Sequence, residues 1–313
     1  MDKRDWKLLA KLDVNGRIPI TELAKACRVS KETALYRFNK LEREGVLTKH
    51  YPFINVYALG YLTIRVYFEL QEMTEEKEKE FVSFLDTKTK ASFIFRMDNV
   101  HKYGILIWAP NIYDIEKKLF ALKKEFGELL VSYTLSVFCS YKQYSRNYLF
   151  PFDTKRVTVD FRPTKSEEVD KEDLQILKAL SADARMSTLE MSRRTGIPQT
   201  TISSRIRKLL QRKILLGYRS EIDFIALGFT NFFLELYLKD NSEVAALESW
   251  ADASKNVVWL QKIIGPCDLE IEVEVKDRKE LEQLLNDLRS KFKSIRKINF
   301  WAQEYKKATY LPA

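Results

Sequence analysis

The side chains best suited to chemistry in this chain are short polar groups and cations that recur at helical spacing. Between residues 199 and 211, Ile202, Ile206 and Leu209 share one face of a predicted helix, which leaves the opposite face polar. Amide and hydroxyl side chains bond base edges in a DNA major groove, while nearby arginines and lysines hold the phosphates. We therefore predict that this helix binds double-stranded DNA through Gln199, Thr200, Thr201, Ser203, Ser204, Arg205, Arg207 and Lys208.

A helix of the same kind is predicted earlier in the chain. Ser30 is placed to cap its first turn, because a serine hydroxyl accepts hydrogen bonds from backbone amides that the helix leaves free. Ala34, Phe38 and Leu41 then form one apolar stripe. The DNA contacts predicted for this helix are Lys31, Glu32, Thr33, Tyr36, Arg37 and Lys40.

The two helices belong to a repeated unit. Placing Asp170 beneath Asp2, an offset of 168 residues, aligns the two stretches without a gap as far as Gly60 and Gly228. Farther along, the likeness continues at an offset of 166, so two residues are missing from the second copy. A period this long indicates duplicated domains, because solenoid repeats span only about 20 to 50 residues. Identical pairs include Asp5/Asp173, Arg17/Arg185, Thr33/Thr201, Arg37/Arg205, Lys40/Lys208, Ile105/Ile271 and Phe126/Phe292.

Positive charge is concentrated in the same two segments. Residues 1–50 hold 12 basic and 7 acidic side chains, residues 170–219 hold 11 and 5, and the whole chain has a net charge of +9. The remainder is therefore slightly acidic. Charge confined in this way is expected if these segments contact phosphates, whereas an ordinary solvated surface would spread it more evenly. A small helical bundle with a solvated basic face is the alternative interpretation.

Each copy is predicted to hold two modules. The first is a helix-turn-helix followed by a wing, with helices at 5–12 and 20–27 and from residue 31, and wing strands at 45–47 and 51–56. The second has the order strand, helix, strand, strand, helix, strand, which is the split βαβ arrangement of ferredoxin-like folds. Its elements in the first copy are 62–68, 75–85, 92–96, 103–108, 112–126 and 131–139, and in the second 231–238, 243–253, 257–264, 269–275, 278–292 and 295–301.

The predicted fold class is thus α+β, with two winged helix-turn-helix domains each followed by a ferredoxin-like βαββαβ domain. Sheets of this kind leave one face in need of cover, so we expect dimer-like packing and a homo-oligomer formed through the ferredoxin-like domains. Within the linker, residues 157–161 are able to add a short strand. The predicted domains are residues 1–57, 58–149, 170–225 and 226–313, with a linker at 150–169.

Several classes of protein are disfavoured. Cys27, Cys139 and Cys267 are far apart, and His50 and His101 are the two histidines, so neither a metal site nor a disulfide framework is predicted. The sequence predicts no cofactor. The apolar runs have the length of strands and the first residues are charged, so we expect a cytoplasmic protein without a membrane span.

These patterns resemble the Lrp/AsnC family of transcription regulators. The resemblance rests on the opening Asp-x-x-Asp-x-x-x-Leu-x-x-Leu at residues 2–12 and 170–180, and on the recognition-helix stretches from Thr33 and Thr201. It implies a sequence-specific DNA-binding regulator, in which Arg37 and Arg205 contact phosphate or anchor the helix. The first copy departs from the family pattern with Leu35 and Tyr36, so we expect it to bind DNA differently or more weakly.

The same resemblance implies a small-molecule effector such as an amino acid, held near a Gly-x-x-Asp turn of the ferredoxin-like module. The second copy has this turn, with candidate effector residues Gly265, Cys267 and Asp268, whereas the first has Asn99 and Lys102 at its ends. A plain hairpin turn explains the glycine and the aspartate equally well.

Two other functions remain open from the sequence. Siroheme decarboxylases share the two-module plan, and His101 with Arg96, Lys102 and Tyr103 would be the cluster for that chemistry. Only one imidazole is present there, so we predict that the chain is not an enzyme. The other alternative is an architectural DNA-binding protein without an effector.

Overall fold

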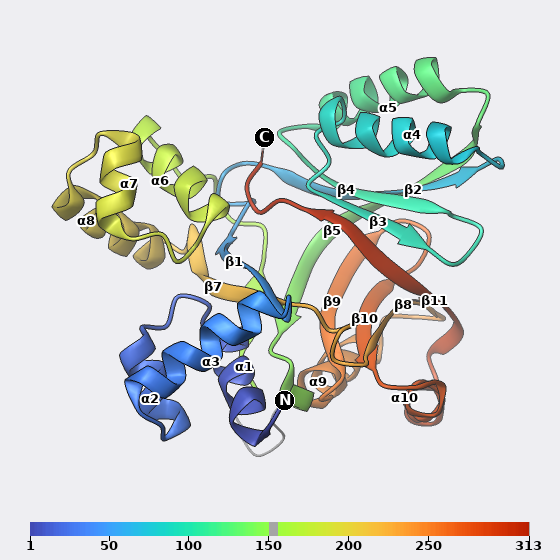
Figure 1. Ribbon diagram of the computed structural model, residues 1–313. Helices are drawn as coiled ribbons and strands as arrows, with labels where there is room; N and C mark the ends of the chain where they lie inside the picture. The colour runs from blue at the N-terminus through green and yellow to red at the C-terminus, as the bar shows by residue number, and fades with distance from the viewer. Residues whose placement is uncertain (150–155, 313) are drawn as a thin grey trace.

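The computed structural model describes residues 1–149 and 156–312, and it has two helical modules beside a layered α/β body (Figure 1). The three predicted helices are confirmed in both copies. Asp2 and Asp170 cap the first helix of each module by accepting hydrogen bonds from backbone amides of its first turn. The modules consist of α1 (Lys3–Val14), α2 (Ile20–Cys27), α3 (Lys31–Arg43) and β1 (Leu47–Ile54), and of α6 (Lys171–Ala182), α7 (Thr188–Thr195), α8 (Gln199–Gln211) and β7 (Leu215–Ile222).

The prediction of a two-stranded wing was wrong in its detail. The segments expected as two wing strands in the first copy lie largely in one continuous strand, β1. It pairs antiparallel with β7, so that Leu47 faces Ile222 and Ile54 faces Leu215. The reason is that the strand's free hydrogen-bonding edge is satisfied by its counterpart in the other copy. The two helical modules are therefore joined by a two-stranded ribbon.

Two repeated arginines reinforce this joint. The Arg185 guanidinium donates a 2.8 Å hydrogen bond to the carbonyl of Gly16, and Arg17 donates in the same way to the carbonyl of Ala184. Each arginine therefore reaches from its own module into the other. This exchange accounts for the identity of the Arg17/Arg185 pair.

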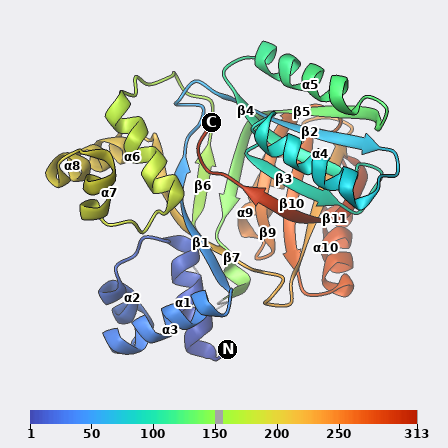
Figure 2. The same cartoon turned by 45° about the horizontal axis from the view of Figure 1, so that its top comes forward.

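Both ferredoxin-like modules have the predicted order of elements. Helices α4 and α5 cover the outer face of one sheet, and α9 and α10 cover the outer face of the other (Figures 1 and 2). The first module consists of β2 (Leu62–Leu70), α4 (Glu75–Thr87), β3 (Phe93–Met97), β4 (Tyr103–Ala109), α5 (Ile112–Phe126) and β5 (Leu130–Tyr144). The second consists of β8 (Thr230–Leu238), α9 (Val244–Ala253), β9 (Val257–Ile264), β10 (Leu269–Val275), α10 (Arg278–Lys291) and β11 (Ile295–Ala308).

The two modules form one closed ring of strands. Its order is β2-β4-β3-β11-β8-β10-β9-β5, and β5 pairs again with β2. The last strand of each module crosses from its own sheet to the other, since β5 pairs with β2 and β9, and β11 pairs with β8 and β3. The expected dimer-like packing is thus realised within one chain.

This crossing explains why the last strands are longer than predicted. They were expected to end at Cys139 and Trp301, but they continue to Tyr144 and Ala308. The added residues pair with the other module, as Tyr141 does with Gln261. Such pairing partners are not visible in the sequence of either strand.

The segment between the copies contributes a further strand. The short strand expected there is confirmed as β6 (Thr158–Phe161), which pairs with the end of β5. A single turn of 3-10 helix (Asn147–Leu149) precedes it. The predicted linker residues 150–155 lie outside the described residues.

Candidate nucleic-acid interface

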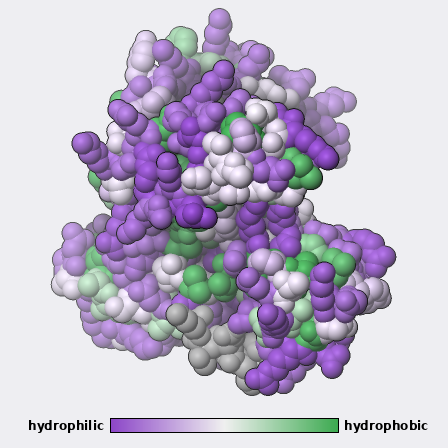
Figure 3. Space-filling model, turned by 90° about the vertical axis from the view of Figure 1, so that its left-hand side faces the viewer, coloured by the Kyte–Doolittle hydropathy of each residue, from purple (hydrophilic) through white to green (hydrophobic). Residues whose placement is uncertain are grey.

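Helix α8 presents the polar face that the sequence predicts. Ile202 and Leu209 are buried, whereas six of the predicted contact residues are exposed and Thr201 and Arg205 are half-buried. Hydrophilic side chains dominate the side of the molecule that carries both helical modules (Figure 3). The exposed residues are Gln199, Thr200, Ser203, Ser204, Arg207 and Lys208.

The two repeated recognition-helix arginines are held by carboxylates inside their own modules. Arg205 Nη1 lies 2.8 Å from Asp170, which caps α6, and 2.9 Å from Asp173 in its first turn. Arg37 Nη1 lies 2.9 Å from Asp2 and 2.6 Å from Asp5 at the start of α1. The charge of each arginine is therefore already balanced, and its geometry is that of a helix anchor.

This anchor also affects the capping carboxylates. The pKa of Asp170 is lowered by the hydrogen bond from the backbone amide of Asp173 and next by the hydrogen bond from Arg205. Asp2 has its pKa lowered by the same kinds of contact in the first module. Both carboxylates are therefore ionised at neutral pH and keep their bonds to the arginines.

Helix α3 has a different surface from α8. Lys31, Glu32 and Tyr36 are exposed, and the Tyr36 side chain projects where α8 has a serine. The Thr33 hydroxyl lies 3.0 Å from the Ser30 hydroxyl within the helix cap, and Lys40 lies 3.7 Å from Glu44. Fewer side chains of α3 are thus free to bond bases or phosphates.

The turn before the recognition helix also differs between the copies. In the second copy it contains Gly196 with φ +75°, a left-handed conformation that glycine adopts without steric cost. At the aligned position of the first copy, Arg28 adopts the same conformation with φ 57°. The first module therefore maintains this turn with a less favourable residue.

The Gly-x-x-Asp turn has structural tasks in this fold. A Cβ atom on Gly265 would lie 2.7 Å from the backbone oxygen of Leu135, so the close approach of β5 requires glycine there. The Asp268 carboxylate accepts a 2.7 Å hydrogen bond from the amide of Leu238. Cys267 is buried, which raises the pKa of its thiol. Of the four turn residues, Pro266 is the one that lines the neighbouring hollow.

The cluster around His101 is not arranged as an anion site. Lys102 Nζ lies 2.7 Å from Glu72, and Arg96 lies 3.8 Å from Glu78. Glu78 also accepts a 2.5 Å hydrogen bond from the Tyr103 hydroxyl. The charges of both cations are therefore offset by neighbouring acids.

The sequence analysis missed an ionic network inside the strand ring. Arg65 of β2 lies 2.8 Å from Glu270 and 3.1 Å from Glu272 of β10, and all three side chains are buried. The hydroxyls of Tyr67 and Ser136 each donate a 2.8 Å hydrogen bond to Glu270. Burial raises the pKa of Glu270, while Arg65 opposes that shift.

One sequence signal did point to this network. Strand β10 carries glutamates at every second position, Glu270, Glu272 and Glu274, so they share one face. Alternation of this kind normally marks a face exposed to water. Here that face is the interior of the ring, which only the pairing of the two copies creates.

Two features are absent from the described part of the chain. Residues 1–149 and 156–312 contain no group of three or more side chains placed to hold a metal ion. No helix within these residues is long and apolar enough to cross a membrane.

Comparison with known proteins identifies the family. A model of the AsnC-type helix-turn-helix domain matches residues 169–210, and a winged helix-turn-helix DNA-binding model matches residues 1–48. A proline dehydrogenase transcriptional activator of Rhizobium radiobacter is 31% identical over 135 residues, which cover 42% of this chain and 86% of the relative. The chain belongs to the Lrp/AsnC family. Another Lrp/AsnC-like relative is the transcriptional regulator Ptr1 of Methanocaldococcus jannaschii, 30% identical over 37% of this chain and 79% of its own length.

A solved structure resembles this Lrp/AsnC chain over nearly its whole length. The siroheme decarboxylase NirDL matches 98% of this chain and 93% of its own, with a TM-score of 0.63 and 14% identity. A second NirDL structure, in complex with an iron-uroporphyrin III analogue, matches with a TM-score of 0.64 and 13% identity. At this identity the likeness shows the fold alone. The tandem architecture is therefore shared with an enzyme, while the relatives similar in sequence are named transcription regulators.

Proposed function

We propose that this Lrp/AsnC chain is a sequence-specific DNA-binding transcription regulator that acts in the cytoplasm. The observation that carries the proposal is the exposed face of α8, on which amide and hydroxyl side chains lie beside Arg207 and Lys208. Such a face suits a major groove, because the polar groups bond base edges and the cations neutralise phosphates.

In this proposal the second helical module makes most of the base contacts. Gln199, Thr200 and Ser204 are exposed and available to bond bases, and the exposed Ser203 hydroxyl, which donates a 2.9 Å hydrogen bond to the carbonyl of Gln199, is still able to accept one. Arg205 and the half-buried Thr201 support the helix. In the first module, Lys31 supplies a phosphate contact, Lys40 has to leave Glu44 to supply another, and Glu32 and Tyr36 limit base contact. Arg37 anchors that helix, and Thr33 completes its cap.

One chain then acts as a regulator dimer does. The β1–β7 ribbon and the ring of strands hold two recognition helices in fixed relation. In dimeric helix-turn-helix proteins the two helices contact half-sites about 10 base pairs apart. Because α3 and α8 differ, we expect two unlike half-sites rather than a palindrome.

Siroheme decarboxylation is the second candidate function, and the described residues form a poor site for siroheme. Siroheme carries many carboxylates, so its pocket needs cations. The aromatic cavity inside the strand ring has a volume of about 70 Å³ and adjoins a hollow of about 310 Å³. Among the described residues that line them, the cations are Arg65 and Arg146, and both are paired with acids. His101, in the turn between β3 and β4, lies beside cations whose charges are already balanced by acids.

Selection of DNA from a random pool tests the proposal. The wild-type protein is expected to enrich a motif with two unlike half-sites, and a variant with Arg207→Ala and Lys208→Ala is expected to lose the half-site that α8 reads. An Arg289→Ala variant on the distant helix α10 is the control. Absence of an enriched motif, together with a change in siroheme absorbance on mixing, would reverse the choice in favour of the enzyme.

A further inference from the structure

Two adjoining hollows open at the mouth of the strand ring. The smaller has a volume of about 70 Å³ and the larger about 310 Å³. An eight-stranded ring has an interior wide enough for side chains or for one small ligand. The smaller hollow alone has room for a few water molecules, whereas the larger reaches the lower limit of ligand pockets, about 300 Å³.

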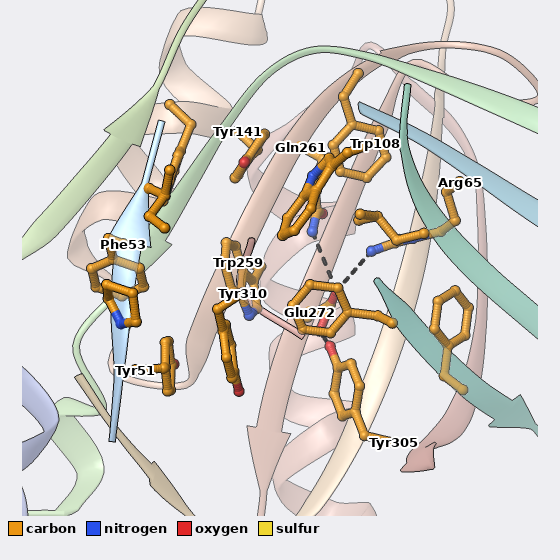
Figure 4. Close-up of a pocket in the computed structure, with 17 residues that line it drawn as sticks. Tyr51, Phe53, Arg65, Trp108, Tyr141, Trp259, Gln261, Glu272, Tyr305 and Tyr310 are labelled. Carbon is orange, nitrogen blue, oxygen red and sulfur yellow. Dashed lines mark hydrogen bonds and ion pairs between the residues drawn. The ribbon is translucent and has the colours of Figure 1, made fainter. Parts of the chain in front are cut away.

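The wall that the two hollows share is almost entirely aromatic. Figure 4 shows its rings gathered around the smaller hollow, with Glu272 among them. The rings of Tyr51 and Tyr310 stack with centroids 3.8 Å apart, and Phe93 meets Tyr310 edge to face at 5.7 Å. The residues common to both hollows are five rings and one carboxylate, namely Tyr51, Phe93, Trp259, Tyr305, Tyr310 and Glu272. Aromatic faces that surround a carboxylate attract cations.

The remaining charges strengthen this preference. The two hollows are lined by five acids and two arginines, although the whole chain has a net charge of +9. Arg65 is paired with Glu270 and Glu272, and Arg146 with Asp13 and Glu274, so neither cation is available to an anion. Glu304 is paired with Lys306, so the lining acids without an ion-pair partner among the described residues are Glu221 and Asp223. Glu221 accepts a 2.8 Å hydrogen bond from Tyr310 and has no ion-pair partner within residues 1–149 and 156–312. The cavity thus favours a positively charged occupant.

A buried hydrogen-bond acceptor without a partner identifies the kind of cation. The side chain of Gln261 is 1% exposed and lines the smaller hollow. Its amide nitrogen donates to Glu272 at 3.2 Å, which fixes the orientation of the amide. Its Oε1 atom then has no partner among the described residues. Since a buried acceptor without a partner is costly, it calls for a hydrogen-bond donor, which a protonated amine supplies together with its charge.

We propose that this cavity binds a small protonated organic amine, with the ammonium group near Glu272 and Gln261 and its carbon skeleton between the aromatic rings. The amine's N–H groups satisfy the amide oxygen, and its charge balances the acidic lining. An uncharged alcohol of the same shape can satisfy the amide oxygen but does not balance the acidic lining, and an anionic molecule gains neither contact.

The test compares the binding of three small molecules with the same carbon skeleton to the intact protein. Phenethylammonium, neutral 2-phenylethanol and anionic phenylacetate are titrated at neutral pH by calorimetry and by tryptophan fluorescence, because Trp259 lies in the wall. The ammonium ion is expected to bind at least tenfold more tightly than the alcohol, and the anion least. Equal binding of ammonium and alcohol, tighter binding of phenylacetate, or no saturable ammonium binding with Kd below about 1 mM would overturn the proposal.

Variants locate the binding in the cavity. Gln261→Leu and Trp259→Leu are each expected to weaken ammonium binding about fivefold to tenfold and to change alcohol binding less. Phe120→Leu is the matched control, since Phe120 is 72% exposed on α5, outside both hollows. Wild-type affinity in both cavity variants would place the amine elsewhere and overturn the assignment. If a cavity variant does not fold, the three-probe comparison on wild-type protein still decides.

Discussion

Arg205 and Arg207 of α8 are expected to have different roles: Arg207 contacts a DNA phosphate, and Arg205 anchors the helix. Arg207 is exposed and has no ion-pair partner in the described part of the chain, whereas Arg205 is bonded to Asp170 and Asp173 and paired with Glu172. A protein cation that neutralises one DNA phosphate steepens the slope of log K against log salt by about 0.9. We therefore expect Arg207→Ala to lower the slope by about 0.9 and Arg205→Ala to lower it by much less.

The size of this effect is measurable. Between 50 and 200 mM salt, a loss of 0.9 in slope makes the Arg207→Ala variant about 3.5-fold less sensitive to salt than wild type. Arg205→Ala is expected to lower the Tm instead, because the Asp173 side chain, which is 10% exposed, loses the cation that is paired with it.

Fluorescence anisotropy with the selected DNA at a series of salt concentrations gives the slopes, and circular dichroism gives the Tm values. Arg289→Ala on α10 is the control for removal of an arginine far from α8. If Arg205→Ala removed the full 0.9 while Arg207→Ala left the slope unchanged, the outward face assigned to α8 would be incorrect.

Three further predictions concern the joints between the copies. Gly16→Ala is expected to lower the free energy of unfolding, measured with urea, by about 1–3 kcal/mol, because the added Cβ would lie 2.4 Å from the backbone of Arg219. An unchanged urea midpoint would contradict this contact. Arg65→Leu is expected to cost about 3–5 kcal/mol by the same measurement, since two buried carboxylates lose their partner; a loss below 1 kcal/mol would show that the network is not needed. Burial lowers the pKa of His50 below its usual 6.5, so the native state binds fewer protons than the unfolded state. Stability should therefore fall as the pH drops through 6.5, and this dependence should be weaker in His50→Gln.

The sequence predicted the elements well where each follows from local periodicity. The apolar stripes of α3 and α8 and the strand–helix order of both ferredoxin-like modules were recovered because period and capping are local properties. The repeat itself was visible because both copies keep the residues that build these elements.

The sequence predicted that the two copies pack like a dimer, but not which residues make the long-range contacts. The ribbon of β1 and β7, the extension of β5 to Tyr144 and the carboxylate partners of Arg37 and Arg205 depend on residues distant in the chain. The candidate DNA residues could be assigned to a helix face from spacing alone, but spacing does not show which cations are already neutralised. The same holds for the glutamates of β10, whose alternation looks solvent-facing until the ring closes.

The buried ionic network gives a physical reason for both copies to lie on one chain. Arg65 aligns with Phe233 in the second copy, and Glu270 and Glu272 align with Gly104 and Leu106 in the first. Two first copies paired together would bury two of these arginines without glutamate partners, and two second copies would bury the glutamates without the arginine. Unpaired buried charges cost several kcal/mol each, so both symmetric pairings are disfavoured and the unlike copies pair with each other. A fused chain keeps these complementary halves at high effective concentration. The same asymmetry gives the ring its acidic, aromatic mouth, with Arg65 and Tyr51 from one copy and Trp259, Gln261 and Glu272 from the other.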